Sequence, residues 1–475
     1  MVLTDIVDRK VGAPRWTALV LLCTANFMVI LDSQIVILAL PSIAADLGMT
    51  TAQAQWVLSA NLLTFGGLLL LGGRAADLLG RRRMFMWGTA LFLGVSLLSG
   101  LAWSTEVMLV ARALHGVSAA LMAPAALSIL TTTFPEGAQR NKALAGWSGI
   151  AGIGATAGLV IGGTLTAGLG WQWVFFVNAP VALVMLLLSP LLLPESHERR
   201  ARHTYDVAGA LTSTAALAVV VYAVVEAPAA GWASGKTVGL FALAAALAGL
   251  FVLLERRSPA PLVPLRIFQS RTLTGGNLVT ALMGMAAFGM SVTISQYAQQ
   301  ALGYSPLEFG LKQAVMPGMA FVGAYAGQAV VTRVGYRPVA AICAVLMGAG
   351  TFLLTQAPAD GQYFRDLFLA LLIFGTGLGA GTVAAAAAAL SRVGERDAGL
   401  ASGINTAALQ IGGAIGVAIV STVIAVNATG TDPAGMTTGY QAAFGACVIF
   451  AATGLVLTLA VLSRSRQPRT DTGSL

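Results

Sequence analysis

The chain has 475 residues, of which 57% are hydrophobic and only 10% are charged. A soluble domain carries about 25% charged residues. Runs of about 20 mostly apolar residues, the length of helix that spans a bilayer, recur along the whole chain and exclude a soluble protein. The net charge of +8 comes from basic residues in short loops, which membrane topology explains better than nucleic acid does. Cys23, Cys343 and Cys447 each lie inside an apolar run, and their spacing fits neither disulfides nor a metal site.

The apolar runs predict an all-α polytopic membrane protein with about fourteen transmembrane helices. They are too long for the strands of a membrane β-barrel. The first run follows Arg15 and is interpreted as a membrane span rather than a cleaved signal peptide. The predicted spans, in chain order, are 16–40, 52–72, 84–103, 107–131, 144–168, 174–193, 207–226, 237–254, 273–298, 307–331, 338–356, 364–390, 398–426 and 440–462.

The distribution of Lys and Arg predicts the orientation. With the amino terminus in the cytoplasm, 23 of the 27 basic residues fall in cytoplasmic segments. Three lie in outside loops, namely Lys236, Lys312 and Arg365, and Arg112 falls within a span. This asymmetry follows the positive-inside rule and predicts that both termini are cytoplasmic.

A degenerate internal sequence repeat predicts two related halves. The segment joining the second and third spans aligns with the segment joining the tenth and eleventh, so that Gly80 and Arg82 match Gly335 and Arg337. Duplicated halves are typical of transporters. The predicted parts are an N-terminal six-helix bundle (1–194), a charged loop with two inserted helices and a cytoplasmic linker (195–266), and a C-terminal six-helix bundle (267–475).

The loop between the second and third spans carries Gly73, Asp77, Gly80, Arg81 and Arg82. Gly80 permits a tight turn, and Asp77 can pair with Arg81. This spacing resembles the cytoplasmic signature of the major facilitator superfamily, and the whole chain resembles its fourteen-helix drug:proton antiporters. The resemblance implies that the loop acts as a cytoplasmic gate.

The first span contains Asp32, a carboxylate well inside an apolar run, in a stretch that resembles the first-helix motif of these antiporters. Ionisable side chains in membrane spans are functional candidates. Burial disfavours the charged carboxylate, so Asp32 is a candidate for binding and releasing a proton. Arg112 and His115 in the fourth span resemble the family's motif with a buried Arg. We expect Asp32 and Arg112 to lie at comparable depth and to couple transport to protons.

The fifth span carries Gly154, Gly158, Gly162 and Gly163. Glycines at four-residue spacing lie along one face of a helix and let helices pack closely. The stretch resembles the motif that marks antiporters within the superfamily, except that Leu159 stands where the family usually has Pro.

Other polar residues are expected in the spans that would line a central cavity. Family-like stretches also occur at 171–180 and at 399–413. The predicted substrate-cavity residues are Asn26, Asn61, His115, Gln296, Gln313 and Asn405.

The resemblance implies a proton-coupled transporter that exports amphipathic drugs, antibiotics or toxic metabolites by alternating access, acting as a monomer in the inner membrane. Two alternatives stay open: an uptake symporter or uniporter for a small metabolite, and a membrane sensor that kept the fold without transport. We expect no enzyme, because the chain has no catalytic or phosphate-binding motif. We also expect no metal, no cofactor and no nucleic-acid partner.

Overall fold

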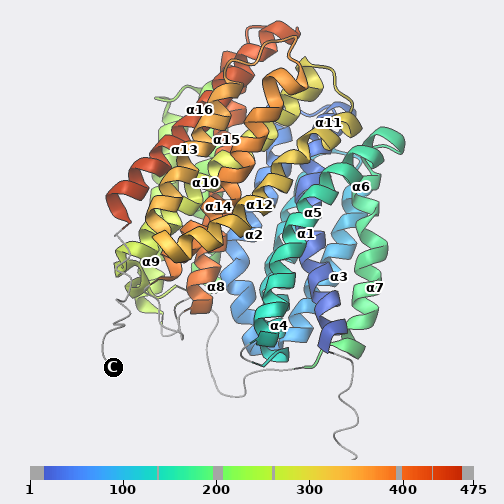
Figure 1. The fold of residues 1–475 in the computed structure, drawn as a ribbon, viewed down its shortest axis with the longest axis vertical. Helices are drawn as coiled ribbons and strands as arrows, with labels where there is room; N and C mark the ends of the chain where they lie inside the picture. Colours follow the sequence, from blue (N-terminus) through green and yellow to red (C-terminus); the bar gives the residue numbers. More distant parts are fainter. Residues whose placement is uncertain are drawn as a thin grey trace, which may run out of the picture.

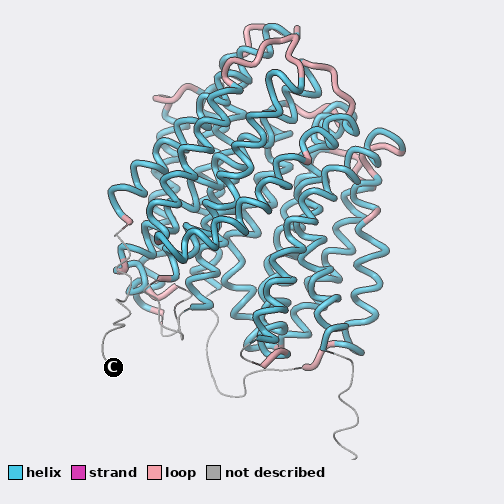
Figure 2. The backbone as a smooth tube through the Cα atoms, viewed as in Figure 1, coloured by secondary structure: helices cyan, strands magenta, loops and turns pink. Residues whose placement is uncertain are grey.

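The computed structural model describes residues 15–135, 138–195, 207–258, 261, 263–391, 398–430 and 432–462. All regular secondary structure in these residues is helical, which confirms the predicted all-α class (Figure 2). The elements are α1 (Arg15–Asp46), α2 (Thr51–Leu79), α3 (Arg81–Gly100), α4 (Thr105–Thr133), α5 (Ala138–Gly168), α6 (Trp173–Phe176), α7 (Asn178–Leu192), α8 (Val207–Ala230), α9 (Gly235–Arg257), η2 (Leu265–Gln269), α10 (Arg271–Gln296), η3 (Tyr297–Ala301), α11 (Pro306–Gln313), α12 (Val315–Val334), α13 (Tyr336–Leu354), η4 (Tyr363–Leu367), α14 (Phe368–Leu390), α15 (Ala398–Asn427) and α16 (Pro433–Val461).

The helices make fourteen passages, as predicted. Thirteen helical segments of the described chain are long and apolar enough to cross a membrane. The fourteenth passage is α5, which has 31 residues and a shorter apolar stretch, Gly152–Gly168. Because the number of passages is even, α1 begins and α16 ends at the same end of the bundle (Figure 1). We call this the terminal end and the opposite one the far end.

The first helix is longer than its predicted span. It continues through Pro41 to Asp46, whereas the sequence predicts an end at residue 40. Proline has no N–H for the carbonyl four residues earlier, so Pro41 leaves the Ile37 carbonyl without its helical donor. The hydroxyl of Ser295 in α10 donates a hydrogen bond to that carbonyl at 3.2 Å. A neighbouring helix thus satisfies the freed group, which is how membrane helices tolerate internal proline.

Prolines also interrupt two predicted spans. The sixth span is divided into α6 and α7, and the tenth into α11 and α12. The last residues before the breaks, Phe176 and Gln313, each precede a proline by four positions, namely Pro180 and Pro317. Neither proline can donate to the carbonyl four residues before it, so each helix is interrupted there.

The passages form two groups and an added pair. Helices α1–α7 pack mainly on one another, and so do α10–α16. Helices α8 and α9 pack together, and α8 covers both α2 and α15, where the two groups meet (Figure 1). This arrangement agrees with two helices inserted between halves, while the exact boundaries at 194 and 266 stay predictions.

The two groups touch mainly where α2 meets α15 and where α5 meets α11 and α12, and α1 also contacts α10. Glycines allow the first two of these contacts. A Cβ atom added at Gly66 in α2 would lie 3.1 Å from the Gln410 Cβ atom in α15. One added at Gly163 in α5 would lie 2.7 Å from the Leu307 Cα atom in α11. Backbones at these places approach so closely that larger side chains do not fit.

Close packing of α2 on α4 depends on Gly72 rather than on the neighbouring motif residue Gly73. A Cβ atom added at Gly72 would overlap the Ala120 carbonyl group of α4. At Gly73 the nearest atom would be the Pro124 Cβ at 3.6 Å, an ordinary van der Waals contact.

This difference predicts opposite outcomes for two adjacent substitutions. Gly72→Ala should force α2 and α4 apart and destabilise the protein by about 1–3 kcal/mol, as overpacking does. Gly73→Ala is the matched control and should leave the melting temperature nearly unchanged. Thermal unfolding of the detergent-solubilised protein, followed by size-exclusion chromatography, measures both. Equal losses of melting temperature would contradict the packing described above.

Candidate functional site

The site forms inside the first group of helices, where α1 and α4 place two charged side chains in contact. Asp32 lies near the middle of α1, and Arg112 lies two turns into α4. The hydroxyl of Ser104 fixes the beginning of α4 by accepting a hydrogen bond from the Val107 amide at 3.4 Å. The Arg112 Nη1 atom donates to Asp32 Oδ2 at 2.8 Å. The two residues that the sequence singles out thus form a direct ion pair.

The ion pair is removed from solvent. Relative exposures are 2% for Asp32 and 1% for Arg112. The Arg112 Nε atom donates to the Val57 carbonyl of α2 at 3.0 Å, and the guanidinium lies 5.9 Å from the centre of the Phe175 ring. A buried charge needs a partner and further hydrogen bonds, because burial removes its hydration. These contacts meet that requirement for Arg112.

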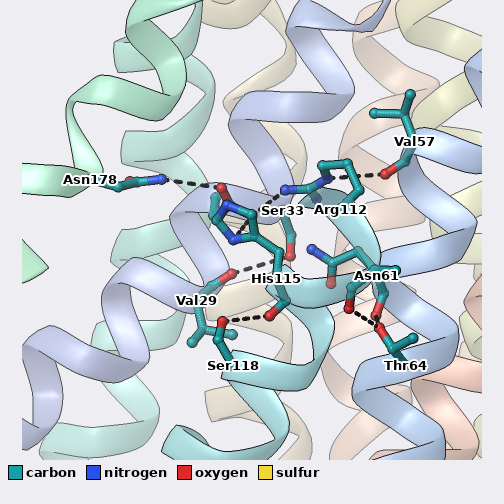
Figure 3. Close-up of polar contacts among 11 residues, drawn as sticks. Val29, Ser33, Val57, Asn61, Thr64, Arg112, His115, Ser118 and Asn178 are labelled. Carbon is teal, nitrogen blue, oxygen red and sulfur yellow. Dashed lines mark hydrogen bonds and ion pairs between the residues drawn. The ribbon is translucent and has the colours of Figure 1, made fainter. Parts of the chain in front are cut away.

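Asn178, to which the sequence pattern gives no role, completes the site. Its Nδ2 atom donates to Asp32 Oδ1 at 3.2 Å, so each carboxylate oxygen has a donor. Asn178 is fully buried and is the first residue of α7, directly after the break that precedes Pro180. Figure 3 shows Asn178 approaching from one side of the site and Arg112 with Val57 from the other. A polar residue at the start of the apolar sixth span was the available signal.

His115 lies one turn after Arg112 on α4 and faces the same carboxylate. Its Nδ1 atom is 3.8 Å from Asp32 Oδ2, beyond hydrogen-bonding distance. The imidazole is 1% exposed and packs against the rings of Phe92 and Phe175, with centroid distances of 5.1 and 6.2 Å. Neither ring nitrogen has a hydrogen-bond partner among the described residues. The structure therefore places His115 beside the ion pair rather than in the wall of an open cavity.

The other predicted cavity residues do not gather at one place. Asn26 donates to the Trp147 carbonyl of α5 at 3.1 Å, and Asn61 is buried on α2. Asn405 of α15 donates to two side chains of α10, those of Asn277 and Thr280. Gln296 is partly buried near the far end of α10. Gln313 is fully buried, and neither of its polar side-chain atoms has a partner among the described residues.

One pocket of about 280 Å³ lies between α2, α8, α9, α10 and α15, outside the ion-pair site. Its lining is mainly apolar, for example Leu70, Leu217 and Ile411, with Asn277 in its wall. None of the predicted cavity residues is in its lining.

The predicted gate loop forms a network at the terminal end. Arg81 donates to Asp77 Oδ1 at 3.3 Å within the α2–α3 joint. The Arg82 Nη1 atom donates a hydrogen bond to the Leu193 carbonyl at 3.2 Å, and its Nε atom lies 3.4 Å from Glu195 Oε2. Gly80, with a φ of 109°, provides the turn between the helices. Glu195, which is not among the predicted gate residues, thus joins the loop to the end of α7.

The glycines of α5 face two different neighbours. Gly154, Gly158 and Gly162 lie against α1, and a Cβ added at Gly158 would lie 2.9 Å from the Gln34 Cβ. Gly163 faces α11 of the other group, and the Leu159 carbonyl packs against Gly310 there. Helix α5 therefore holds the charged helix α1 on one face and the second group on the other.

A membrane bundle with two related groups and a buried charge pair between helices is typical of secondary transporters. Residues 22–256 and 276–474 match the Major Facilitator Superfamily. The chain belongs to this superfamily.

Several related proteins are named as antibiotic resistance or export proteins. The chain is 38% identical to the puromycin resistance protein pur8 of Streptomyces alboniger, over 94% of this chain and 90% of that protein. It is 36% identical to the cephamycin export protein CmcT of Amycolatopsis lactamdurans, over 95% and 94% of the two chains. The tetracenomycin C resistance and export protein of Streptomyces glaucescens is 34% identical, over 87% and 76%.

Solved structures of distant sequence share the fold. The nucleoside transporter NupG superposes with a TM-score of 0.66 at 12% identity, covering 94% of this chain and 100% of that one. Tetrameric PepTSo2 gives a TM-score of 0.66 at 18% identity, covering 94% and 98%.

The ion pair predicts a characteristic pattern of stability. Arg112→Gln leaves a buried carboxylate without its counter-ion and should destabilise the protein by about 3–5 kcal/mol. The double variant Asp32→Asn/Arg112→Gln removes both charges and should regain most of the lost melting temperature. Thermal unfolding in one detergent compares the three proteins. A double variant no more stable than Arg112→Gln would argue against a direct pair.

Proposed function

We propose that the chain is a proton-coupled exporter of amphipathic small molecules, such as antibiotics, drugs or toxic metabolites. It works by alternating access as a monomer in the cell (inner) membrane, with both termini in the cytoplasm. The inward proton gradient drives export, and no cofactor takes part. The observation that carries the proposal is the buried ion pair between Asp32 and Arg112.

The related proteins support export rather than uptake. Three that match over most of the chain carry the names of resistance or export proteins for puromycin, cephamycin and tetracenomycin C. All three compounds are organic antibiotics. The fold alone would leave the direction open, because solved structures that share it include a nucleoside transporter and proton-dependent oligopeptide transporters.

The ion pair supports proton coupling. An ionised pair inside a membrane protein is costly to maintain without a functional need. A proton that binds at the site alters the charge balance between α1 and α4 and changes how firmly these helices are held. A compound entering from the cytoplasm or the inner leaflet would displace that proton, and release outside would allow another proton to bind.

The contacts between the two groups of helices support a state closed at the far end, which the proposed topology puts outside. The Ser295 hydroxyl donates to the Ile37 carbonyl, and the Gln299 amide donates to the Leu38 carbonyl at 3.1 Å. Gly163 lies against Leu307 at the same end. The network of Asp77, Arg81, Arg82 and Glu195, by contrast, joins only helices of the first group. Its proposed role is to gate the cytoplasmic end during the cycle.

The first test removes the charge of the coupling carboxylate. Asp32→Asn should abolish proton-driven efflux of ethidium from whole cells, because the site can no longer exchange a proton against the compound. The protein should still insert and remain monodisperse. Wild-type efflux should stop with a protonophore. Full proton-driven efflux by Asp32→Asn would overturn the scheme, and uptake of the probe with the gradient would identify a symporter instead.

A second test opens the far end by steric conflict. Gly163→Val should clash with Pro306 and Leu307 and favour the outward-open state. Ser295→Cys provides the reporter, since Ser295 is 1% exposed at this seam. A membrane-impermeant maleimide added to right-side-out vesicles should label this cysteine at least about tenfold faster in Gly163→Val, which corresponds to about 1.4 kcal/mol of population shift. Gly168→Val is the matched control, because no atom lies within 4 Å of its Cβ position. Equal labelling in both variants would argue against closure at this seam.

A further inference from the structure

The imidazole of His115 is the buried titratable group whose contacts are least complete. Both of its ring nitrogens lack a hydrogen-bond partner among the described residues. Buried polar groups are nearly always bonded, and a neutral imidazole needs both a donor and an acceptor partner. The Asp32 Oδ2 atom lies 3.8 Å from Nδ1. A small displacement of the ring would turn this contact into a hydrogen bond.

Protonation of Asp32 itself meets an electrostatic obstacle. The Arg112 guanidinium is 1% exposed and depends on the Asp32 carboxylate for its counter-charge. A neutral carboxyl group would leave this guanidinium buried without an ionic partner, which is strongly unfavourable. If the proton instead binds His115, Asp32 stays ionised and lies between two cations. The added charge then gains an anionic partner, and the existing pair is preserved.

We propose that His115 is the proton-binding residue of this site, with Asp32 as the counter-ion that it shares with Arg112. The proposal rests on the proposed function and specifies where its proton resides. On uptake, the free lone pair of the imidazole forms an N–H bond as an O–H bond of a hydronium ion breaks, leaving water. On release, the same N–H bond breaks, the proton passes to water, and neutral imidazole returns.

The groups around His115 act on its charge in opposite directions. Asp32 from α1 and Arg112 from α4 are the charged groups that act on it. The other helices packed against this part of α4 contribute uncharged side chains: Phe92 from α3, Phe175 from α6, Asn178 from α7 and Asn61 from α2. Aromatic rings exclude water and also attract cations through their faces. The response of His115 to pH therefore depends on the ion pair beside it.

A direct measurement can locate the proton. The chain has three histidines, and His197→Gln/His203→Gln leaves His115 as the remaining one. In this background, ¹⁵N-histidine NMR of the full chain in lipid nanodiscs should show His115 converting to imidazolium as the pH falls from 8 to 4.5. Asp32→Asn should lower the midpoint by at least about one pH unit, a tenfold weaker proton affinity. A neutral His115 over the whole range, with the Asp32 carboxyl carbon reporting protonation instead, would overturn the proposal.

Transport assays separate this proposal from the proposed function. His115→Gln retains hydrogen-bonding groups but cannot bind a proton, and it should reduce proton-driven ethidium efflux at least about tenfold. His197→Gln/His203→Gln is the matched control and should keep wild-type efflux and its pH profile. Loss of efflux in Asp32→Asn together with a wild-type pH profile in His115→Gln would overturn the role of His115 alone. Efflux that persists in Asp32→Asn would overturn the proposed function.

Discussion

A carboxylate and a guanidinium that are almost out of contact with water determine how the helices of the N-terminal group are placed relative to one another. Asp32 and Arg112 come from helices α1 and α4, and their charges are tolerable at this depth only when every ionic atom has a partner. The backbone of α2 and the side chain of Asn178 supply the remaining bonds. Four helices are therefore tied to one ion pair, and their relative positions respond to its charge.

Glycines allow the helices next to this ion pair to pack closely. Helix α5 lies against α1 through Gly158, which is next to the turn that carries Asp32. The opposite face of α5 meets the second group through Gly163 and the Leu159 carbonyl. Leucine at position 159 leaves α5 unbroken there, so this helix connects the charged helix to the other half as a continuous element. The absence of the usual proline thus changes the local helix without removing the close contact.

The sequence predicts the parts of this structure that depend on composition along the chain. Run lengths predict the fourteen passages, and the carboxylate and the arginine within apolar runs single out the two residues that form the ion pair. It does not predict which groups lie next to each other across helices. Gly72, rather than the motif residue Gly73, carries the α2–α4 contact, because rotation of the helix decides which glycine faces the neighbour. Asn178 at the start of α7 contacts the ion pair, and Glu195 just after its end contacts the loop. Periodicity along the chain does not reveal that α7 lies beside α1 and α3.

The same limit explains why the polar cavity residues do not converge. Asn405 is satisfied by Asn277 and Thr280 within the second group, and Asn26 by the backbone of α5. A polar residue in an apolar run signals a need for a partner, and that partner is often the nearest helix rather than a ligand. Only the packed structure distinguishes the two.

Charge and movement are linked through the backbone of α1. Within the described parts of the two groups, the buried charged side chains Asp32 and Arg112 belong to the first group, whereas the buried polar side chains of α10 are uncharged. The connection to the second group begins about one and a half turns beyond Asp32, where Pro41 frees the Ile37 carbonyl for Ser295. A helix that lacks one internal hydrogen bond bends more easily at that point. A change in the partners of Asp32 can therefore tilt the far part of α1 and break or make the bonds that hold the two groups together.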